Sequence, residues 1–304
     1  MTAIEEVANR VIENASKGLH LDLEDCFSIL DSVEKIFSDE QNIIDIAPPV
    51  LAIADMHGQL FDMLKIFEIC KESSKFLFLG DYVDRGPYSV ELFIYLAAKK
   101  ILQPNNYYLI RGNHEDSGVN STYGLFEDCK QIYRSNSLYL RMNEVFLSLP
   151  IAAIIGNKIF CVHGGLGPTS ETIEKINDVY RYQDIDQNKT LTDITWSDPD
   201  FISQKFIENS RGAGHIMGKT AVLEFLNNNK FNLILRAHQT QDLGYRFYFD
   251  SKLLSLWSAP LYYGTQSKAK VLNINEDLSH ELIAIEPAEK RTRTDEILLD
   301  YFKY

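Results

Sequence analysis

The segment Phe76-Leu-Phe-Leu-Gly-Asp-Tyr-Val-Asp-Arg-Gly86 begins as a short apolar run and ends in charged side chains. An apolar run of this length that ends at a glycine is typical of a buried strand. Four other apolar runs end in the same way: Val50–Ala54 before Asp55 and His57, Tyr107–Ile110 before Asn113 and His114, Ile159–Val162 before His163, and Leu233–Leu235 before His238. Open α/β sheets bind ligands at the carboxyl ends of their strands, so we expect these side chains to form one site.

The rest of the chain alternates between helix-length and strand-length segments. Its amphipathic stretches are Leu60–Cys70, Val90–Lys99 and Leu138–Leu149, and its further apolar runs are Ile151–Ile155, Leu253–Trp257 and Val271–Ile274. This alternation predicts an α/β fold. We expect one domain over residues 1–290, with N-terminal helices over 1–45. The remaining tail, 291–304, is charged and then aromatic, and we expect it to be mobile or bound to a partner.

The charge of the chain disfavours some classes of partner. Among 304 residues, 30 are Lys or Arg and 43 are Asp or Glu, which gives a net charge of −13. Nucleic acids and anionic membranes bind clustered basic residues, so neither is expected as a partner. Residues 1–50 hold 11 acidic and three basic residues. We interpret this excess as a solvated helical face, and the alternative is an acidic surface for a basic partner or substrate.

Cysteine spacing and the first residues indicate a cellular compartment. Cys26, Cys70, Cys129 and Cys161 are far apart and form no CxxC pair, so neither a disulfide framework nor a zinc knuckle is expected. The first six residues lack the apolar core of a signal peptide, and no apolar run is long enough to cross a membrane. We therefore expect a reducing compartment, the cytoplasm and also the nucleus.

Six of the side chains that follow strands are of the kind that bind divalent transition metals. They are Asp55, His57, Asp81, Asn113, His163 and His238. Oxygen and imidazole donors without thiolate suit manganese, iron or zinc, and six ligands are more than one ion needs. We expect two divalent ions that share Asp81, with Asp55 and His57 on one ion and the other three ligands on the second. Such a pair would activate a water molecule for in-line displacement at phosphorus.

Each of these motifs taken alone has an ordinary structural explanation. Asp55 could cap a helix and His57 could be a hydrogen-bonded core histidine, and the His163-Gly-Gly165 motif is weaker still. What favours the metal interpretation is that all five motifs occur in order, each one directly after an apolar strand.

His114 and Asp84 form the predicted acid pair. His114 directly follows a predicted metal ligand, so its side chain can point at a substrate beside the ions. A serine or threonine alkoxide needs a proton as it leaves, so we predict that His114 is the general acid. Asp84, three residues after Asp81, would hold the other imidazole nitrogen; its structural alternative is a turn residue.

The arginines divide into two kinds. Arg85 and Arg211 could each bind phosphate oxygens through the guanidinium fork, and Arg211 lies in a glycine-rich loop where an exposed arginine needs such a reason. Arg111 and Arg236 lie between a strand and a turn, so we interpret them as partners of buried carboxylates.

The chain resembles the phosphoprotein phosphatase family of serine/threonine protein phosphatases over about residues 20–290. The motifs that carry the resemblance are Asp55-Met-His57-Gly58, Gly80-Asp-Tyr-Val-Asp-Arg-Gly86, Gly112-Asn-His-Glu115, His163-Gly-Gly165 and Arg236-Ala-His238. Further segments resemble the branch of types 2A, 4 and 6: Trp196–Asp200, Arg211–Gly214, Trp257–Pro260 and Asp300–Phe302.

This resemblance implies a metallophosphoesterase-type sandwich of two mixed β-sheets flanked by helices, with a dimetal site at the carboxyl ends of the strands. It implies one-step hydrolysis of phosphoserine and phosphothreonine in proteins, with two divalent ions, manganese before iron or zinc. It implies the metal ligands and the acid pair given above. It places Arg85, Arg211, Asn113 and Tyr262 at the substrate phosphate, and it implies phosphoprotein substrates and regulatory or scaffold subunits as partners.

The chain departs from the family pattern at several positions. Ala54 replaces a glycine, Pro87 an aromatic residue, Leu261 an asparagine and Tyr263 a cysteine. The sequence ends in Lys303-Tyr304 and not in leucine, so carboxyl methylation of a terminal leucine does not carry over to this chain.

Two other functions fit part of this pattern. Metallophosphoesterases of small molecules, such as dinucleoside polyphosphatases, share the metal motifs, but Trp196–Asp200 and Trp257–Pro260 favour a protein phosphatase. A catalytically weak scaffold is suggested by Pro87 and Leu261, but the intact set of ligands argues against it.

Overall fold

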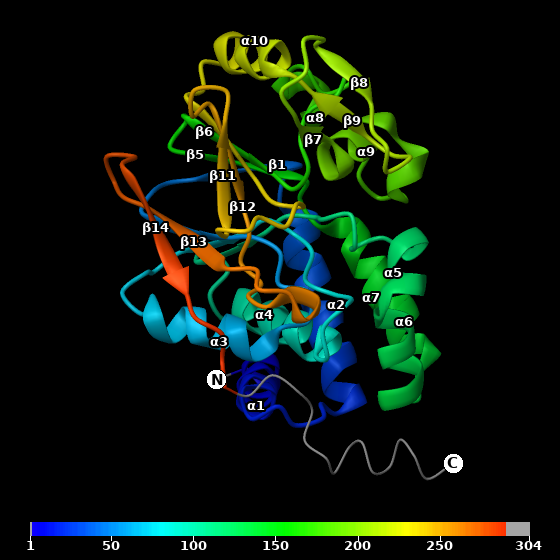
Figure 1. Cartoon of the computed structure of the whole chain (residues 1–304). Helices are drawn as coiled ribbons and strands as arrows, with labels where there is room; N and C mark the ends of the chain where they lie inside the picture. Colours follow the sequence, from blue (N-terminus) through cyan, green and yellow to red (C-terminus); the bar gives the residue numbers. More distant parts are fainter. Residues whose placement is uncertain (1, 290–304) are drawn as a thin grey trace.

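A computed structural model describes residues 2–289 of the chain (Figure 1), so the predicted tail over 291–304 lies outside the described residues. The helices are α1 (Ala3–Ser16), α2 (Leu23–Asp39), α3 (Leu60–Ile69), α4 (Ser89–Leu102), α5 (Ser117–Tyr123), α6 (Leu125–Glu127), α7 (Asn136–Ser148), α8 (Ile173–Asn177), α9 (Lys189–Trp196) and α10 (Lys219–Asn229). The strands are β1 (Ile43–Ile46), β2 (Val50–Ile53), β3 (Phe76–Phe78), β4 (Tyr107–Leu109), β5 (Ala152–Ile155), β6 (Ile159–Val162), β7 (Asp198–Pro199), β8 (Phe206–Glu208), β9 (His215–Met217), β10 (Leu233–Arg236), β11 (Tyr245–Tyr248), β12 (Leu253–Leu256), β13 (Ala269–Ile274) and β14 (His280–Ile285). Within these residues, none of the helices has the length and hydropathy that a membrane crossing needs.

The first two helices begin where the sequence supplies capping side chains. Thr2 and Glu5 form a reciprocal capping box at the start of α1, and the carboxylate of Asp22 accepts from the backbone N–H groups of Glu24 and Asp25 at the start of α2. The expected helical region over 1–45 is too long, because α2 ends at Asp39 and residues 43–46 form strand β1. This short strand pairs with β5, more than a hundred residues away, which no local pattern reveals.

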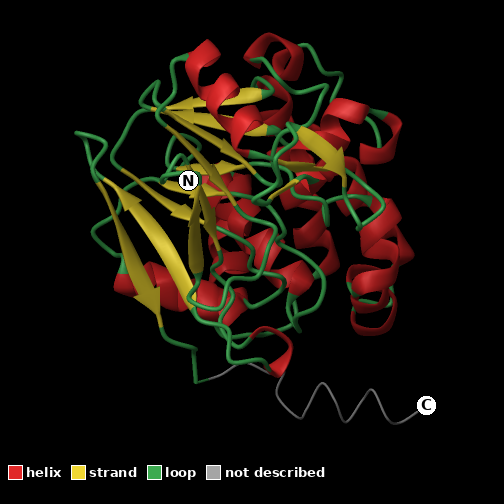
Figure 2. Ribbon diagram, turned by 45° about the horizontal axis from the view of Figure 1, so that its top comes forward, coloured by secondary structure: helices red, strands yellow, loops and turns green. Residues whose placement is uncertain are grey.

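Two mixed sheets form the predicted sandwich. One has the strand order β1-β5-β6-β10-β12-β11 and the other β14-β13-β2-β3-β4. Strands β2, β3 and β4 run parallel to one another, and β6 runs parallel to β10. Helices cover the outer sides of both sheets (Figure 2). The architecture is the predicted α/β class.

Three apolar cores hold these layers together. The core between the sheets contains residues from both, among them Leu77, Ile155, Leu235 and Leu272. A second core joins the five-stranded sheet to α1–α4 and α7, and a third joins the six-stranded sheet to α8–α10. Strands buried on both faces read as continuous apolar runs, and this explains why the sequence reveals the central strands so clearly.

A third, three-stranded sheet was not predicted. Its strands β7, β9 and β8 hold two, three and three residues, and β8 lies near the surface, so the hydrophobic pattern is weak. In Figure 1 this sheet lies beside α8 and α9, on the upper side of the molecule. Its position matters because β7 contains Asp198, which contacts Arg211.

Candidate dimetal site and active centre

The six predicted metal ligands lie together and are buried. Asp81 is at their centre: its Oδ2 lies 3.5 Å from His57 Nε2, and its Oδ1 lies 3.3 Å from His163 Nε2. The other three ligands lie beside these two histidines. Asp55 Oδ2 is 3.8 Å from His57 Nε2, and Asn113 Oδ1 and His238 Nδ1 are 2.9 Å and 3.2 Å from His163 Nε2. Loops after β2, β3, β4, β6 and β10 therefore deliver their side chains to one place.

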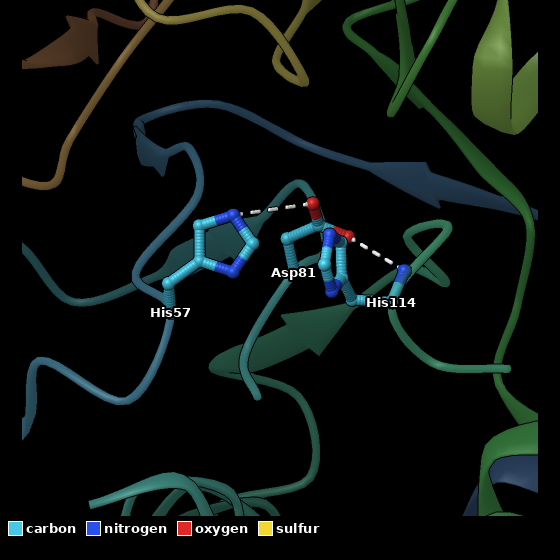
Figure 3. Close-up of side chains that lie close together, drawn as sticks. All are labelled: His57, Asp81 and His114. Carbon is cyan, nitrogen blue, oxygen red and sulfur yellow. Dashed lines mark hydrogen bonds and ion pairs between the residues drawn. The ribbon is translucent and has the colours of Figure 1, made fainter. Parts of the chain in front are cut away.

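Asp81 belongs to two groups of candidate metal ligands. One group combines it with His57 and His114, and the other with His163 and His238. Sharing of one carboxylate by two groups is the arrangement that a bridging ligand requires. The presence of His114 in the first group differs from the sequence-based expectation, in which His114 acts on the substrate; Figure 3 shows His57 and His114 around Asp81.

Backbone carbonyls orient two of the imidazoles. The Nδ1 atom of His57 lies 2.9 Å from the carbonyl of Val83, and that of His163 lies 2.8 Å from the carbonyl of Leu79. An Nδ1–H that donates to a carbonyl leaves the Nε2 lone pair free, and in both residues Nε2 is the atom that faces Asp81. Both rings therefore present a ligand atom to the centre of the cluster.

The electrostatics of the cluster fit divalent cations. Burial, with a contribution from the charge of Asp81, raises the pKa of Asp55 to about 6. Burial and the charge of His114 lower the pKa of His57 to about 3, so its imidazole is in the neutral form that binds metals. Among the described residues, Asp55 Oδ2 and His238 Nε2 are buried without a hydrogen-bond partner. A bound cation would satisfy both of these buried atoms, so the ligand atoms of the cluster fit the two expected metal ions.

The site is built on unusual backbone conformations. Five of its residues have positive φ angles: His57 (42°), Asp81 (56°), Asp84 (69°), Arg85 (70°) and His238 (68°). Residues other than glycine adopt this region rarely, at a cost that the surrounding structure must offset. Their concentration here indicates that the fold directs these side chains inward at the expense of local conformational energy.

Glu115 holds the central loop, and the sequence motifs did not single it out as a functional residue. Its carboxylate accepts hydrogen bonds from the backbone N–H groups of Asp81 (2.8 Å), Tyr82 (2.8 Å) and Gly112 (2.9 Å). Burial, reinforced by the charge of Asp81, raises its pKa to about 7. A Cβ atom on Gly112 would lie 2.3 Å from Asp81 Oδ1, so only glycine fits there. The available signal was the position of Glu115 directly after Asn113 and His114.

His114 and Asp84 are in contact, as the sequence predicts. His114 Nδ1 lies 2.6 Å from Asp84 Oδ2, and the other carboxylate oxygen accepts from the backbone N–H of Leu125 at 2.8 Å. Burial opposes protonation of His114, but the carboxylates of Asp81 and Asp84 outweigh it and raise the pKa of His114. The pair therefore favours an imidazolium that can donate a proton.

Arg85 and Tyr262 also lie at this centre. The charge of Arg85 contributes to the lowered pKa of His57, after burial and His114. Tyr262 stacks on the ring of His57 with centroids 5.2 Å apart, and it packs edge-on against Trp257 at 4.9 Å. The structure thus brings Tyr262, which only the family resemblance indicated, next to a predicted metal ligand.

Arg211 also lies near this centre. Its Nε donates to Asp198 Oδ2 at 2.7 Å, and its charge contributes, after burial, His163 and Arg236, to the lowered pKa of His238. Asp198 also pairs through its other oxygen with Arg236 at 3.0 Å. Asp198 therefore orients Arg211, a role that could not be assigned from its place in the Trp196–Asp200 segment alone.

Arg111 and Arg236 have the structural roles that were expected. Both are fully buried, and each pairs with a buried carboxylate: Arg111 Nη2 lies 3.1 Å from Asp116 Oδ2, and Arg236 pairs with Asp198. Arg236 also donates to the carbonyl of Gly164 at 2.6 Å, which ties β10 to the loop after β6.

Comparison with known proteins places this fold and site in a family. The model of the calcineurin-like phosphoesterases matches residues 48–242, which include all six predicted ligands. The chain therefore belongs to the calcineurin-like phosphoesterases. A protein phosphatase 2A catalytic subunit of Dictyostelium discoideum is 41% identical over 254 residues, 82% of this chain and 81% of that protein. The serine/threonine-protein phosphatase 4 catalytic subunit of Saccharomyces cerevisiae is 36% identical over 304 residues, 97% of this chain and 98% of that protein.

These relatives narrow the assignment to the phosphoprotein phosphatase family, in the branch of types 2A and 4. A solved serine/threonine phosphatase of Saccharomyces cerevisiae, with similarity to human phosphatase PP5, superposes with a TM-score of 0.87 at 28% identity and covers 95% of this chain and 98% of its own. A cold-active protein-tyrosine phosphatase of a Shewanella species shares the fold, with a TM-score of 0.56 at 18% identity over 81% of this chain and 84% of its own.

Proposed function

We propose that this protein phosphatase acts on phosphoserine and phosphothreonine of proteins through the cluster centred on Asp81. The observation that supports this most is the convergence of six metal-binding side chains with the His114–Asp84 pair, in a chain whose relatives are serine/threonine phosphatase catalytic subunits. Phosphate monoesters hydrolyse extremely slowly in water, so their cleavage needs the combined charge and acid chemistry that this cluster can supply.

Two divalent ions fit the donors around Asp81, one with Asp55 and His57 and the other with Asn113, His163 and His238. The donor set favours manganese, iron or zinc, and we propose manganese as the ion to test first. Bound there, two ions would activate a water molecule as the nucleophile and neutralise charge on the phosphate.

The side chains of the chain itself have separate roles in this proposal. Asn113, Arg85, Arg211 and Tyr262 bind and orient the phosphate. Water forms a new bond to phosphorus as the bond between phosphorus and the serine or threonine oxygen breaks. His114 gives its proton to that leaving oxygen, so the products are the free hydroxyl side chain and inorganic phosphate.

Asp84 acts through His114 in this scheme, and Asp84→Asn tests it. The amide keeps the size of the side chain but loses the charge that favours the imidazolium. We expect kcat for a phosphoserine peptide to fall about tenfold to a hundredfold, with KM within about twofold of the wild type. Steady-state kinetics measure both. Asp178→Asn, at an exposed position outside the site, is the matched control; equal kcat values for the two variants would remove Asp84 from this role.

The substrate class is tested by comparing two substrates on the same manganese-loaded preparation. We expect the kcat/KM of a phosphoserine peptide to exceed that of a dinucleoside polyphosphate. The reverse order would favour a small-molecule phosphoesterase. Absence of turnover on both, together with near-zero metal content after gentle purification, would favour a scaffold protein.

We also propose regulatory or scaffold subunits as partners, because the relatives are themselves catalytic subunits. The acidic residues of positions 1–50 lie outside the cluster, so they bear on solubility or partner choice and not on catalysis. We propose no nucleic acid or membrane partner, and a location in the cytoplasm and nucleus. Affinity capture of the full chain followed by mass spectrometry tests for these subunits.

A further inference from the structure

Arg85 is held by two tyrosines beside the proposed phosphate site. Its Nη1 donates a hydrogen bond to the hydroxyl of Tyr263 at 2.5 Å. Its guanidinium carbon lies 3.8 Å from the ring centroid of Tyr123 and 5.3 Å from that of Tyr263. Cation–π contacts with two rings and a hydrogen bond restrict rotation of a long side chain that would otherwise be mobile.

The hydrogen bond to Tyr263 uses only one terminal nitrogen of the guanidinium. A guanidinium offers its N–H groups as forks, and one fork is formed by Nε and the nearer terminal nitrogen, Nη2. The structure uses Nη1 for Tyr263, whereas Nε of Arg85 is buried and has no hydrogen-bond partner among the described residues. Two parallel N–H donors match two oxygens of a phosphate group. The buried and unpaired N–H of Nε could therefore donate to an oxygen of a bound phosphate.

The backbone of the loop that contains Tyr263 has a defined conformation that places the tyrosine beside Arg85. Residues Tyr262–Gly264 form a single 3-10 turn, and both Leu261 and Tyr263 have a φ of 51°, in the left-handed region. The backbone N–H of Tyr262 donates to Ser267 Oγ at 3.0 Å, which closes the loop. Adjacent tyrosines therefore have different targets, because Tyr262 stacks on His57 while Tyr263 contacts Arg85.

Tyr263 also stands at the entrance to the site. The loop lines a cleft of about 340 Å³ together with His57 and Arg85, and Tyr263 is 64% exposed. At this position the family pattern has a cysteine, which is too short to make the same contact with Arg85.

We propose that Tyr263 is a positioning residue that fixes Arg85 so that its Nε–Nη2 edge faces the substrate phosphate. This inference deepens the proposed function and rests on it, since it needs Arg85 to bind phosphate. Tyr263 acts on the binding of the phosphate and not on proton transfer. It therefore affects KM and the inhibition constant of inorganic phosphate more than kcat.

Tyr263→Phe removes the hydroxyl and keeps the ring. We expect the KM for a phosphoserine peptide and the inhibition constant of inorganic phosphate each to rise about threefold to tenfold, with kcat within twofold. This is less than the full effect of a hydrogen bond to a charged group, because the lost bond acts on the phosphate only through Arg85. Tyr263→Cys, which restores the residue of the family pattern, should raise both at least as much. In an Arg85→Lys background, Tyr263→Phe should change them by less than twofold, because lysine lacks the Nε–Nη2 fork that the hydroxyl is proposed to orient.

Tyr180→Phe is the matched control, since it removes a hydroxyl from another exposed tyrosine outside the site. Unchanged constants in Tyr263→Phe, tighter phosphate binding in Tyr263→Cys, or an equal effect in the Arg85→Lys background would each overturn the proposal. A readout without turnover separates it from the substrate assignment: phosphate should raise the melting temperature of manganese-loaded wild type more than that of Tyr263→Phe. That result in a protein with no phosphopeptide turnover would support the role of Tyr263 and overturn the proposed function.

Discussion

Replacement of His114 by Asn is expected to lower kcat for a phosphoserine peptide about a hundredfold to ten-thousandfold, the range typical of a lost general acid. His114 Nδ1 is held at 2.6 Å by Asp84, and nearby carboxylates raise its pKa, which favours the protonated imidazole that the leaving oxygen needs. Asn has no proton to donate at neutral pH. Stopped assays of phosphate release at saturating peptide measure the loss.

Two further measurements decide between roles for His114. The activity of His114→Asn on an aryl phosphate, whose phenolate leaves without protonation, should fall much less than its activity on the peptide. Metal content should stay at the wild-type value if His114 acts on the substrate. Loss of metal from His114→Asn would instead make His114 a ligand, as its proximity to His57 and Asp81 also allows. His280→Asn, at an exposed position on β14, is the matched control.

Asp81→Asn is expected to reduce bound metal from two ions per chain to one or fewer, and to lower kcat/KM by more than a hundredfold. Asp81 is the one residue common to both groups of candidate ligands, and its two oxygens face His57 and His163. The amide removes a negative charge between two cations and offers only one good ligand oxygen. Elemental analysis after gentle purification measures the metal, and phosphopeptide assays measure the activity.

Folding must be checked for this variant, because Asp81 Oδ1 also accepts the backbone N–H of His114 at 3.0 Å. Circular dichroism in chelator should be the same for Asp81→Asn and the wild type. Asp45→Asn removes a charge at an exposed position on β1 and should keep both ions. Retention of two tightly bound ions by Asp81→Asn would show that Asp81 does not bridge them.

The central strands and the residues after them could be predicted from the sequence because their signals are local. A strand buried on both faces is a continuous apolar run, and the chain must turn directly after it. The sequence therefore places Asp55, Asn113 and His163 just after the ends of strands. The convergence of Asp55 and Asn113 also follows from it, because β2 and β4 end at the same edge of one sheet; that His163 joins them from the other sheet depends on how the two sheets pack.

The edges of the sheets could not be predicted in this way. Strand β1 exists because residues 43–46 pair with β5, and β8 is short and largely exposed. The three residues of β8 are too few and too exposed to show a strand pattern. The four residues of β1 are mostly apolar, but so short a run next to a helix cannot be told from the end of that helix. For the same reason, the helical region predicted from the sequence extends to residue 45, whereas helix α2 ends at Asp39.

By itself the sequence determined the fold class, the order of the motifs and the donors of the cluster, because each depends on neighbours along the chain. Only the tertiary structure decided which side chains orient those donors. Glu115 holds the Asp81 loop, Asp198 holds Arg211, and Tyr263 contacts Arg85 across 178 positions of sequence. Such contacts depend on how separate loops meet in the folded chain, and no periodicity in the sequence encodes that meeting.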